Sequence, residues 1–236
     1  MPLPKDSDES EARAVVDRYA RRDPNLRQRY DPLRPDVWQT MQERQRALLS
    51  YLAFHGRPLA SLDVLEIGCG AGPNLLELLR LGFDASRLVG NELLPDRAAL
   101  ARHALPAAVR VVEGDALALP FAPGSFDLVY QSTVFTSILD DSFQQRLASR
   151  MWEWLRPGGA IIWYDFTFDN PRNADVRGVS LRRVRELFPA GRFKSQRLTL
   201  APPISRRVCR IHPAAYTLFN SLPWLRTHVL AWIEKV

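Results

Sequence analysis

The chain is predicted to fold as a doubly wound α/β sandwich, because short apolar segments typical of strands alternate along it with segments of helical spacing. Its 236 residues, of which 46% are hydrophobic, are enough for one well-packed domain. We expect residues 61–236 to form this domain, with a helical insertion at 202–226 before the last strand. Residues 1–60 are expected to form a helical cap in front of it.

The most informative stretch is a strand that turns sharply into a helix between residues 62 and 81. An apolar run over 62–67 carries Glu66 and is followed by glycines at every second position, Gly68, Gly70 and Gly72. Pro73 suits the first residue of a helix, because a helix start leaves that N–H unpaired in any case. A glycine loop at a helix N-terminus lets a ligand approach the backbone and offers it N–H donors. The stretch therefore predicts either a ligand-binding loop or a purely structural turn.

Two further strands lead into acidic residues. The strand over 88–90 is followed by Glu92, at the interval where nucleotide-binding folds place a carboxylate for the ribose. A carboxylate can accept hydrogen bonds from both hydroxyls of a diol. The strand over 109–113 runs into Gly-Asp-Ala at 114–116. For Glu92, the alternative is a solvated charge at the end of a strand.

Together with strands at 125–132 and 160–163, these motifs resemble those of class I S-adenosylmethionine-dependent methyltransferases across residues 62–165. The resemblance implies a Rossmann-like sheet of seven strands whose last strand is antiparallel, and S-adenosyl-L-methionine as the cofactor. A dinucleotide is disfavoured, because Pro73 stands where its motif has the last glycine. The cofactor-binding residues that the resemblance implies are Glu66, Gly68, Cys69, Gly70, Asn74, Asn91, Glu92, Leu93, Gly114, Asp115, Ala116 and Gln131.

The N-terminal segment is predicted to contain helices over 10–22 and 37–54, because apolar residues recur there at helical spacing. In similar methyltransferases such a segment covers the cofactor. Tyr19, Tyr30 and Arg44 are the candidates for this contact. For each of them the alternative is an ordinary surface or packing role.

The formal net charge is +6, and the positive excess lies in residues 170–236. Arginine binds phosphate and carboxylate through paired hydrogen bonds, so we expect an anionic acceptor or surface. The insertion 202–226 combines an apolar stripe with an arginine cluster, which predicts a helical hairpin at the acceptor site or in peripheral contact with a membrane. Alternatively, the stripe packs on the sheet and the arginines are merely solvated. The candidate contacts for the acceptor are Arg177, Arg206, Arg207 and Arg210.

Other features bear on compartment and on partners. The cysteines are Cys69 and Cys209 alone, so no disulfide framework is expected and a reducing compartment is favoured. The charged N-terminus and the lack of any long apolar run predict a cytoplasmic protein without a transmembrane segment. No metal site is expected, because metal-ligand spacing is missing. Nucleic acid is not expected either, because the Asn/Asp-Pro-Pro-aromatic motif of base-directed methyltransferases is missing after the fourth strand.

A base for the acceptor's proton is expected at the carboxyl edge of the sheet, where ligands of open α/β folds bind. Asp165, at the end of the fifth strand, is the catalytic candidate, and a structural or cofactor-facing role is its alternative. The loop 164–173 is expected to contact the acceptor. We expect no histidine at a strand end near this edge and consider only His212. Segments at 168–178 and 225–228 resemble methyltransferases of bacterial surface glycan and glycolipid synthesis, which implies O-methylation of a sugar hydroxyl. The alternatives are C- or O-methylation of a quinone-like or natural-product molecule, and a non-catalytic scaffold that binds the cofactor.

Overall fold

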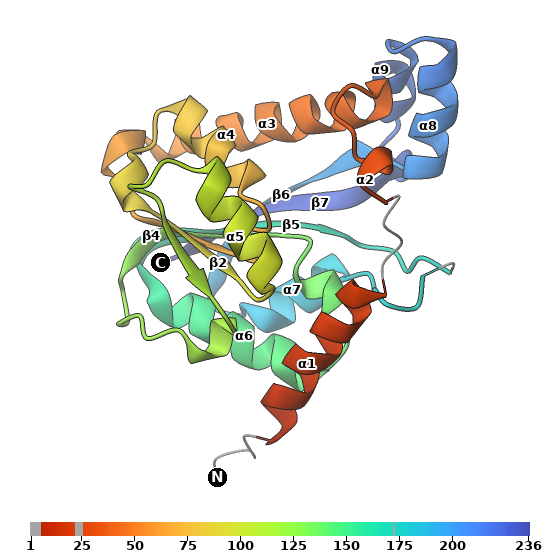
Figure 1. Ribbon diagram of the computed structural model, residues 1–236. Coiled ribbons are helices and arrows are strands. Elements are labelled where there is room, and N and C mark those ends of the chain that lie inside the picture. The colour runs from red at the N-terminus through yellow and green to blue at the C-terminus, as the bar shows by residue number, and fades with distance from the viewer. Residues whose placement is uncertain (1–5, 22–25, 172) are drawn as a thin grey trace.

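The computed structural model describes residues 6–21, 26–171 and 173–236. Seven strands form one sheet in the order β3-β2-β1-β4-β5-β7-β6 (Figure 1), and β7 is antiparallel to both of its neighbours. The other neighbouring pairs are parallel, which confirms the predicted fold class. The strands are β1 Val64–Ile67, β2 Leu88–Glu92, β3 Arg110–Glu113, β4 Phe126–Ser132, β5 Leu155–Phe166, β6 Gly191–Leu200 and β7 Arg226–Lys235.

Helices cover both faces of the sheet (Figure 1). Helices α3, α4 and α5 lie on one face, and α6 and α7 lie on the other, with α1 on the α6 side. The α-helices are α1 Asp6–Ala20, α2 Leu26–Arg29, α3 Pro35–His55, α4 Pro73–Leu81, α5 Pro95–Ala104, α6 Asp141–Trp154, α7 Leu181–Leu187, α8 Pro202–Ile211 and α9 Ala215–Asn220. Short 3-10 turns are η1 Leu59–Ser61, η2 Ala85–Arg87, η3 Ala116–Ala118, η4 Phe135–Ser137 and η5 Pro223–Leu225.

The sheet separates two apolar clusters, because successive side chains of a strand point to opposite faces. Leu65 of β1 packs with α6 and α7, whereas its neighbour Val64 packs with α3, α4 and α5. All four residues of β1 are buried, as expected for a central parallel strand. This central strand leads directly into the glycine loop, so the best-packed part of the sheet supports that loop.

The insertion forms the helices α8 and α9, which pack against α3 near its start (Figure 1). The buried carboxylate of Glu43 on α3 connects these parts. It accepts hydrogen bonds from the Tyr216 hydroxyl at 2.7 Å, the Asn220 amide at 2.7 Å and the Thr199 backbone N–H at 3.0 Å. A buried carboxylate needs such donors to remain stable, so Glu43 fixes the insertion to the sheet and to α3.

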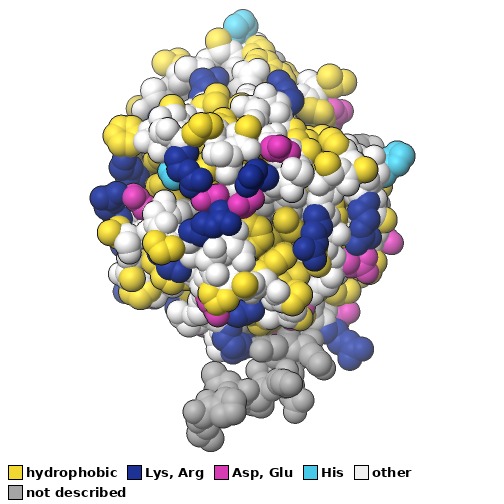
Figure 2. All heavy atoms as spheres, turned by 90° about the vertical axis from the view of Figure 1, so that its left-hand side faces the viewer, with side chains coloured by type: hydrophobic (Ala, Val, Ile, Leu, Met, Phe, Trp, Pro, Cys, Tyr) yellow, Lys and Arg dark blue, Asp and Glu magenta, His cyan; other side chains and the backbone are white. Residues whose placement is uncertain are grey.

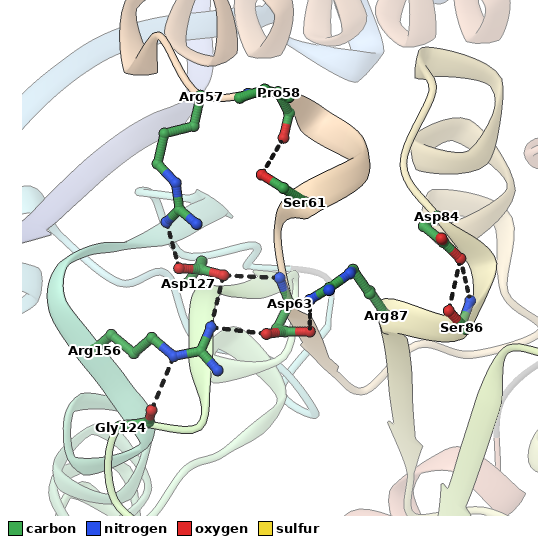
Figure 3. A network of polar contacts seen from close by, with 10 residues as sticks. All are labelled: Arg57, Pro58, Ser61, Asp63, Asp84, Ser86, Arg87, Gly124, Asp127 and Arg156. Carbon is green, nitrogen blue, oxygen red and sulfur yellow. Dashed lines mark hydrogen bonds and ion pairs between the residues drawn. The ribbon is translucent and has the colours of Figure 1, made fainter.

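A network of ion pairs lies at the opposite, amino edge of the sheet, on the side where the C-terminus lies in Figure 1. Figure 2 shows acidic and basic side chains gathered on this face. Asp127 accepts hydrogen bonds from Arg57 at 2.5 Å and from Arg156 at 2.8 Å, and Asp63 accepts from Arg87 and Arg156 (Figure 3). The network joins the beginnings of β1, β4 and β5, away from the glycine loop.

Candidate active site

The glycine loop passes closely between two neighbouring segments. Gly68, Gly70 and Gly72 have φ values of 66°, 60° and 85°, in the left-handed region that side chains disfavour. A Cβ atom on Gly68 would lie 2.5 Å from Cγ2 of Val134, and one on Gly70 would lie 2.6 Å from a guanidinium nitrogen of Arg97. Backbone conformation therefore favours glycine at all three positions, and the contact with Val134 adds a spatial reason at Gly68. The loop presents bare backbone at the start of α4.

A chain of polar side chains runs beneath this loop. Asn74, in the first turn of α4, donates a hydrogen bond to Oε1 of the fully buried Glu66 at 2.6 Å, and Arg44 of α3 donates to Oδ1 of Asn74 at 2.8 Å. Oε2 of Glu66 has no hydrogen-bond partner among the described residues. Burial raises the pKa of Glu66 to about 7, although the Asn74 amide and Arg44 oppose the rise. A buried carboxylate oxygen without a donor fits a ligand that brings a cationic amino group.

Glu92, at the end of β2, is 4% exposed and holds the glycine loop. Oε2 of Glu92 accepts the N–H of Gly70 at 2.8 Å, and Oε1 accepts the N–H of Leu94 at 3.0 Å. Each carboxylate oxygen has a second lone pair, so ribose hydroxyls can bind in addition to these backbone groups. The predicted role of Glu92 as a ribose ligand stays a prediction.

The predicted adenine side of the site lies where β2 and β3 end. Asn91 donates its side-chain amide to the carbonyl oxygens of Gly114 at 2.9 Å and Val112 at 3.3 Å, so its amide joins the two strands. Asp115 accepts the N–H of Leu117 at 2.9 Å and caps the turn η3, which begins at the buried Ala116. We therefore expect Asn91 to position this edge of the site, and Asp115 and Ala116 to contact the ligand.

Two other predicted cofactor residues adjoin the loop. Cys69 is buried, its N–H donates to the carbonyl of Asn91 at 2.8 Å, and burial raises the pKa of its thiol. Such a thiol stays protonated and inert, as expected for a small loop residue. Leu93 is half-buried and follows Glu92 directly.

The end of β4 forms the next part of the site. Gln131 is fully buried, its Oε1 accepts the N–H of Val134 at 3.2 Å, and its Nε2 has no hydrogen-bond partner within the described chain. The turn η4 follows, and Asp165 of β5 holds it by accepting the N–H of Thr136 at 3.3 Å. Burial raises the pKa of Asp165, which is 0% exposed, to about 7. We expect Asp165 to position this turn, and its predicted catalytic role stays a prediction.

Helix α1 lies against the same turn. Arg18 pairs with Glu11 at 2.7 Å and donates to the carbonyl of Ser137 at 3.0 Å. The guanidinium of Arg97, which adjoins Gly70, lies 5.2 Å from the ring centre of Tyr19. Tyr19 therefore lies near the glycine loop, as a residue that covers a ligand must. Tyr30, in contrast, is 69% exposed.

The four arginines that were predicted to contact the acceptor do not lie together. Arg177 forms an ion pair with Asp141 on the α6 side, and its N–H donates to the carbonyl of Thr136 at 2.9 Å. Arg206, Arg207 and Arg210 lie on α8, which packs against α3 on the other side of the sheet. His212 is exposed, and its Nδ1 accepts the N–H of Ala214 at 3.1 Å.

The loop 164–173 leaves β5 at the carboxyl edge, as predicted. Its residues Thr167 and Phe168 line a cavity of about 310 Å³ with Ser180, Arg197 and Val229. Part of this loop, Tyr164 and Phe166, belongs to β5 itself and faces α3 instead. The loop thus has polar and aromatic groups on both sides of the sheet edge.

The expectation that no histidine lies at a strand end near this edge was wrong. Since β7 is antiparallel, its beginning lies beside the end of β5, where His228 pairs with Phe166. The His228 ring stacks on Tyr164, with 5.0 Å between ring centres and 16° between planes. Burial, and then the charge of Arg44, lower the pKa of His228 to about 4. The predicted antiparallel strand over 227–236 was the signal that could have identified it.

The described part of the chain contains no candidate metal centre and no membrane-spanning helix. No group of three or more histidine, cysteine, aspartate or glutamate side chains there could hold a metal ion. No helix in that part is long and apolar enough to cross a membrane.

Residues 64–159 match a family model described as a methyltransferase domain. Demethylmenaquinone methyltransferase of Deinococcus radiodurans is 35% identical over 106 residues, covering 44% of this chain and 42% of that protein. Sterol 24-C-methyltransferase erg-4 of Neurospora crassa is 27% identical over 158 residues, covering 64% and 39%. The chain thus matches less than half the length of these curated relatives.

Solved structures share the fold. A SAM-dependent methyltransferase from Thermotoga maritima aligns with a TM-score of 0.64 and 17% identity, covering 94% of this chain and 99% of that one. Geranyl diphosphate C-methyltransferase from Streptomyces coelicolor, in complex with S-adenosyl-L-homocysteine, aligns with a TM-score of 0.60 and 18% identity, covering 81% and 77%. Residues 64–159 thus match a methyltransferase domain, and the sheet has the fold of solved SAM-dependent methyltransferases. S-adenosyl-L-methionine is the cofactor proposed for it.

Proposed function

We propose that the protein methylates a small, lipophilic aromatic acceptor of the quinol type. The observation that carries this proposal is the aromatic group at the carboxyl edge of β5 and β7. There the His228 ring stacks on Tyr164 and meets Phe166 edge to face, and the guanidinium of Arg44 lies 5.3 Å from the centre of the Tyr164 ring. Aromatic walls suit a planar ring, and a cation suits the phenolate that forms when such a ring is activated. The match to a demethylmenaquinone methyltransferase supports the same acceptor class.

Four residues are proposed to hold the cofactor. Oε2 of Glu66 would accept from the amino group, Arg44 would bind the carboxylate, Glu92 the ribose hydroxyls and Asp115 the adenine amine. When bound, the cofactor supplies a methyl group already activated on a sulfonium. The chain therefore has to bind and orient the cofactor and the acceptor, and to exclude water from them. The unpaired oxygen of Glu66 supports this orientation, because no described residue satisfies it.

A sugar hydroxyl on an anionic glycan or glycolipid precursor is the second candidate acceptor. The arginines of the insertion favour it, because Arg207 and Arg210 are exposed and no Asp or Glu occurs between Glu186 and Glu234. The local chemistry favours the quinol instead. A sugar hydroxyl is much less acidic than a phenolic one, so it needs a stronger base to lose its proton.

We also propose that the insertion touches an anionic membrane surface, where a lipophilic acceptor would reside. Ile211 on α8, Leu218 on α9 and Trp224 on η5 are 85%, 70% and 72% exposed. Arg207 and Arg210 on α8 form no ion pair with a described residue. Exposed apolar side chains beside unpaired cations suit the interface of an anionic bilayer. A cytoplasmic location remains part of the proposal, and the two buried, free cysteines support it.

The experiment that tests the acceptor class is a turnover assay with S-adenosyl-L-methionine and a panel of acceptors, read as S-adenosyl-L-homocysteine formed. The panel contains a short-chain 2-prenyl-1,4-naphthoquinol, a phenol without a second hydroxyl, and a nucleotide-linked hexose. We expect turnover of the naphthoquinol above the other two. Turnover of the hexose alone would replace the quinol with the sugar acceptor.

A further inference from the structure

The imidazole of His228 has a defined environment on three sides. Tyr164 stacks on it at 5.0 Å, Phe166 meets it at 5.8 Å with planes 70° apart, and Oγ1 of Thr227 lies 3.0 Å from its Nδ1. The side chain is half-buried, and Nε2 makes no hydrogen bond with any described residue. One ring nitrogen is thus held by the protein, and the other has no hydrogen-bond partner among the described residues.

The contacts of the Thr227 hydroxyl bear on which nitrogen of His228 carries the proton. This hydroxyl lies 3.0 Å from Nδ1 of His228 and 3.4 Å from the carbonyl oxygen of Thr199, and it has one proton to donate. When it donates to the carbonyl of Thr199, it accepts from His228, so that Nδ1 carries the hydrogen and Nε2 keeps its lone pair. This is the tautomer that a base acting through Nε2 requires.

Two residues with strained backbone contact Tyr164, the residue on which His228 stacks. Among the described residues, Thr133 and Thr199 are the non-glycine residues with positive φ, at 59° and 65°. The Thr133 N–H donates to the carbonyl of Tyr164 at 2.8 Å, and the Thr199 hydroxyl lies 2.7 Å from the Tyr164 hydroxyl. Strain of this kind costs energy and clusters at functional sites. Thr199 thus holds the side chain of Tyr164, on which His228 stacks, and Thr133 holds its backbone.

We propose that His228 is the catalytic base that receives the acceptor's proton at Nε2, with Thr227 as the positioning residue that fixes its tautomer. The inference rests on the proposed function, because it takes a hydroxyl acceptor as the substrate. In the step, the acceptor O–H bond breaks and its proton bonds to Nε2. The electron pair left on the acceptor, on oxygen or on the conjugated ring carbon, forms the bond to the methyl carbon. The pair of the old bond would stay on the cofactor sulfur. For methylation on oxygen, Nε2 then releases its proton to solvent; for ring methylation, the ring proton leaves to solvent and Nε2 returns its proton to the ring oxygen.

The charges around His228 specify the kind of acceptor. Arg44 of α3 is the charged group that faces it; Tyr164 of β5 is neutral, since burial raises its pKa to about 12, and Leu198 and Thr199 of β6 carry no charge. A nearby cation disfavours imidazolium and favours a phenolate. The same arginine thus weakens the base and acidifies the acceptor. His228 is suited to an acidic hydroxyl, such as that of a phenol or quinol.

The kinetic test compares His228→Ala and Thr227→Val with the wild type, using the short-chain naphthoquinol as acceptor. We expect kcat to fall about 10²- to 10⁴-fold in His228→Ala and to recover in part with added imidazole. Thr227→Val is expected to lower kcat about tenfold with little change in KM, because the wrong tautomer becomes populated. Calorimetry should give the same affinity for S-adenosyl-L-homocysteine in all three proteins. A kcat of His228→Ala within threefold of the wild type would overturn the proposal.

A second readout does not depend on turnover. In ¹⁵N-histidine-labelled protein at pH 7, we expect the His228 nitrogens to report a protonated Nδ1 and a bare Nε2, and Thr227→Val to lose this preference. A protonated Nε2 in the wild type would overturn the assignment whatever the kinetics. If the wild type binds S-adenosyl-L-homocysteine but fails to methylate the naphthoquinol, the quinol acceptor of the proposed function fails. The ¹⁵N chemical shifts of His228 then still decide whether Nε2 is unprotonated, as a base acting through Nε2 requires.

Discussion

The side-chain amide of Asn74 donates a hydrogen bond of 2.6 Å to Oε1 of Glu66 and leaves Oε2 without a partner among the described residues. The other end of the Asn74 amide accepts from Arg44, so all three side chains are held in one orientation. Glu66 comes from the central strand, Asn74 from the helix after the glycine loop and Arg44 from the N-terminal cap. The relationship therefore couples the cap to the domain at the point where the cofactor's amino group is proposed to bind.

The first prediction concerns the pH dependence of cofactor affinity. The pKa of Glu66 is raised to about 7, so below this pH the carboxyl is protonated and cannot accept a cationic amino group as a carboxylate. We expect the affinity for S-adenosyl-L-methionine to increase about tenfold between pH 5.5 and pH 7, while the amino group stays protonated. Calorimetry at both pH values measures this. Glu66→Gln should bind more weakly and without the pH dependence, and an equally flat wild type would contradict the role of Glu66.

The second prediction separates backbone strain from crowding in the glycine loop. Gly68 and Gly56 have nearly the same φ, 66° and 73°, but a Cβ on Gly56 meets nothing within 4 Å. Gly56→Ala should cost about 1 kcal/mol in the free energy of unfolding and leave cofactor affinity unchanged. Gly68→Ala should cost more, because its Cβ overlaps Val134, and should weaken cofactor binding at least tenfold. Denaturant unfolding and calorimetry measure both effects. Equal behaviour of the two variants would show that the contact with Val134 is easily relieved.

The parts of the site that depend on local spacing could be predicted from the sequence. The glycine loop, Glu66 and Glu92 lie in one strand-turn-helix unit or its neighbour, and their positions follow from the order of strands. The orientation of β7, in contrast, came only from a resemblance. The position of His228 beside the end of β5 follows only when the strand that neighbours β5 is known. That neighbour depends on pairing between residues far apart in the chain.

Other residues could not be predicted because their partners come from distant elements. Glu43 looks like a surface residue of an amphipathic helix, yet α9 and β6 bury it and supply its donors. Asp165 was predicted from its place at a strand end, which says nothing about the backbone N–H groups that the turn η4 brings to it. Position along the chain predicted where the carboxylate lies, and packing determines what it does.

The third prediction concerns the ion-pair network at the amino edge of the sheet. Asp127 is 2% exposed; burial alone would raise its pKa, but the Asp63 N–H and the guanidiniums of Arg57 and Arg156 lower it overall. Asp127→Asn should destabilise the protein by about 2 kcal/mol, because the buried side chain loses its charge-assisted hydrogen bonds to two partly exposed arginines. Denaturant unfolding measures this. The matched control is Glu113→Gln, which breaks the exposed pair with Arg102 and should cost below about 1 kcal/mol.

The sign of the pH effect follows from the lowered pKa of Asp127. Its contribution is fully present above the unfolded pKa of about 4 and is lost as pH falls through the folded pKa. The difference in stability between wild type and Asp127→Asn should therefore shrink on acidification below pH 4. Cofactor affinity should stay unchanged at neutral pH, since the network lies at the edge opposite the glycine loop. A variant as stable as the wild type at pH 7 would contradict the structural role of the network.

The fourth prediction concerns the membrane contact proposed for the insertion. Arg207 and Arg210 lie on α8 beside exposed apolar residues, among them Trp224 at 72% exposure. Each arginine near an anionic bilayer contributes about 1 kcal/mol, so Arg207→Glu/Arg210→Glu should lower binding to phosphatidylglycerol vesicles more than tenfold. Trp224→Ala should also weaken binding, through loss of buried apolar area. Sedimentation with phosphatidylglycerol and with neutral phosphatidylcholine vesicles, at two ionic strengths, measures these changes.

The control for this experiment is Arg182→Glu/Arg185→Glu, an equal charge change on α7, which covers the other face of the sheet. It should bind vesicles nearly as well as the wild type if α8 makes the contact, because only charges within a Debye length of the bilayer act on it. Wild-type binding should also weaken as salt is raised. Equal losses in both double variants would show attraction by net charge alone, without docking through the insertion. No binding of the wild type to anionic vesicles at low salt would remove the membrane from the proposal and leave Ile211, Leu218 and Trp224 as ordinary exposed residues.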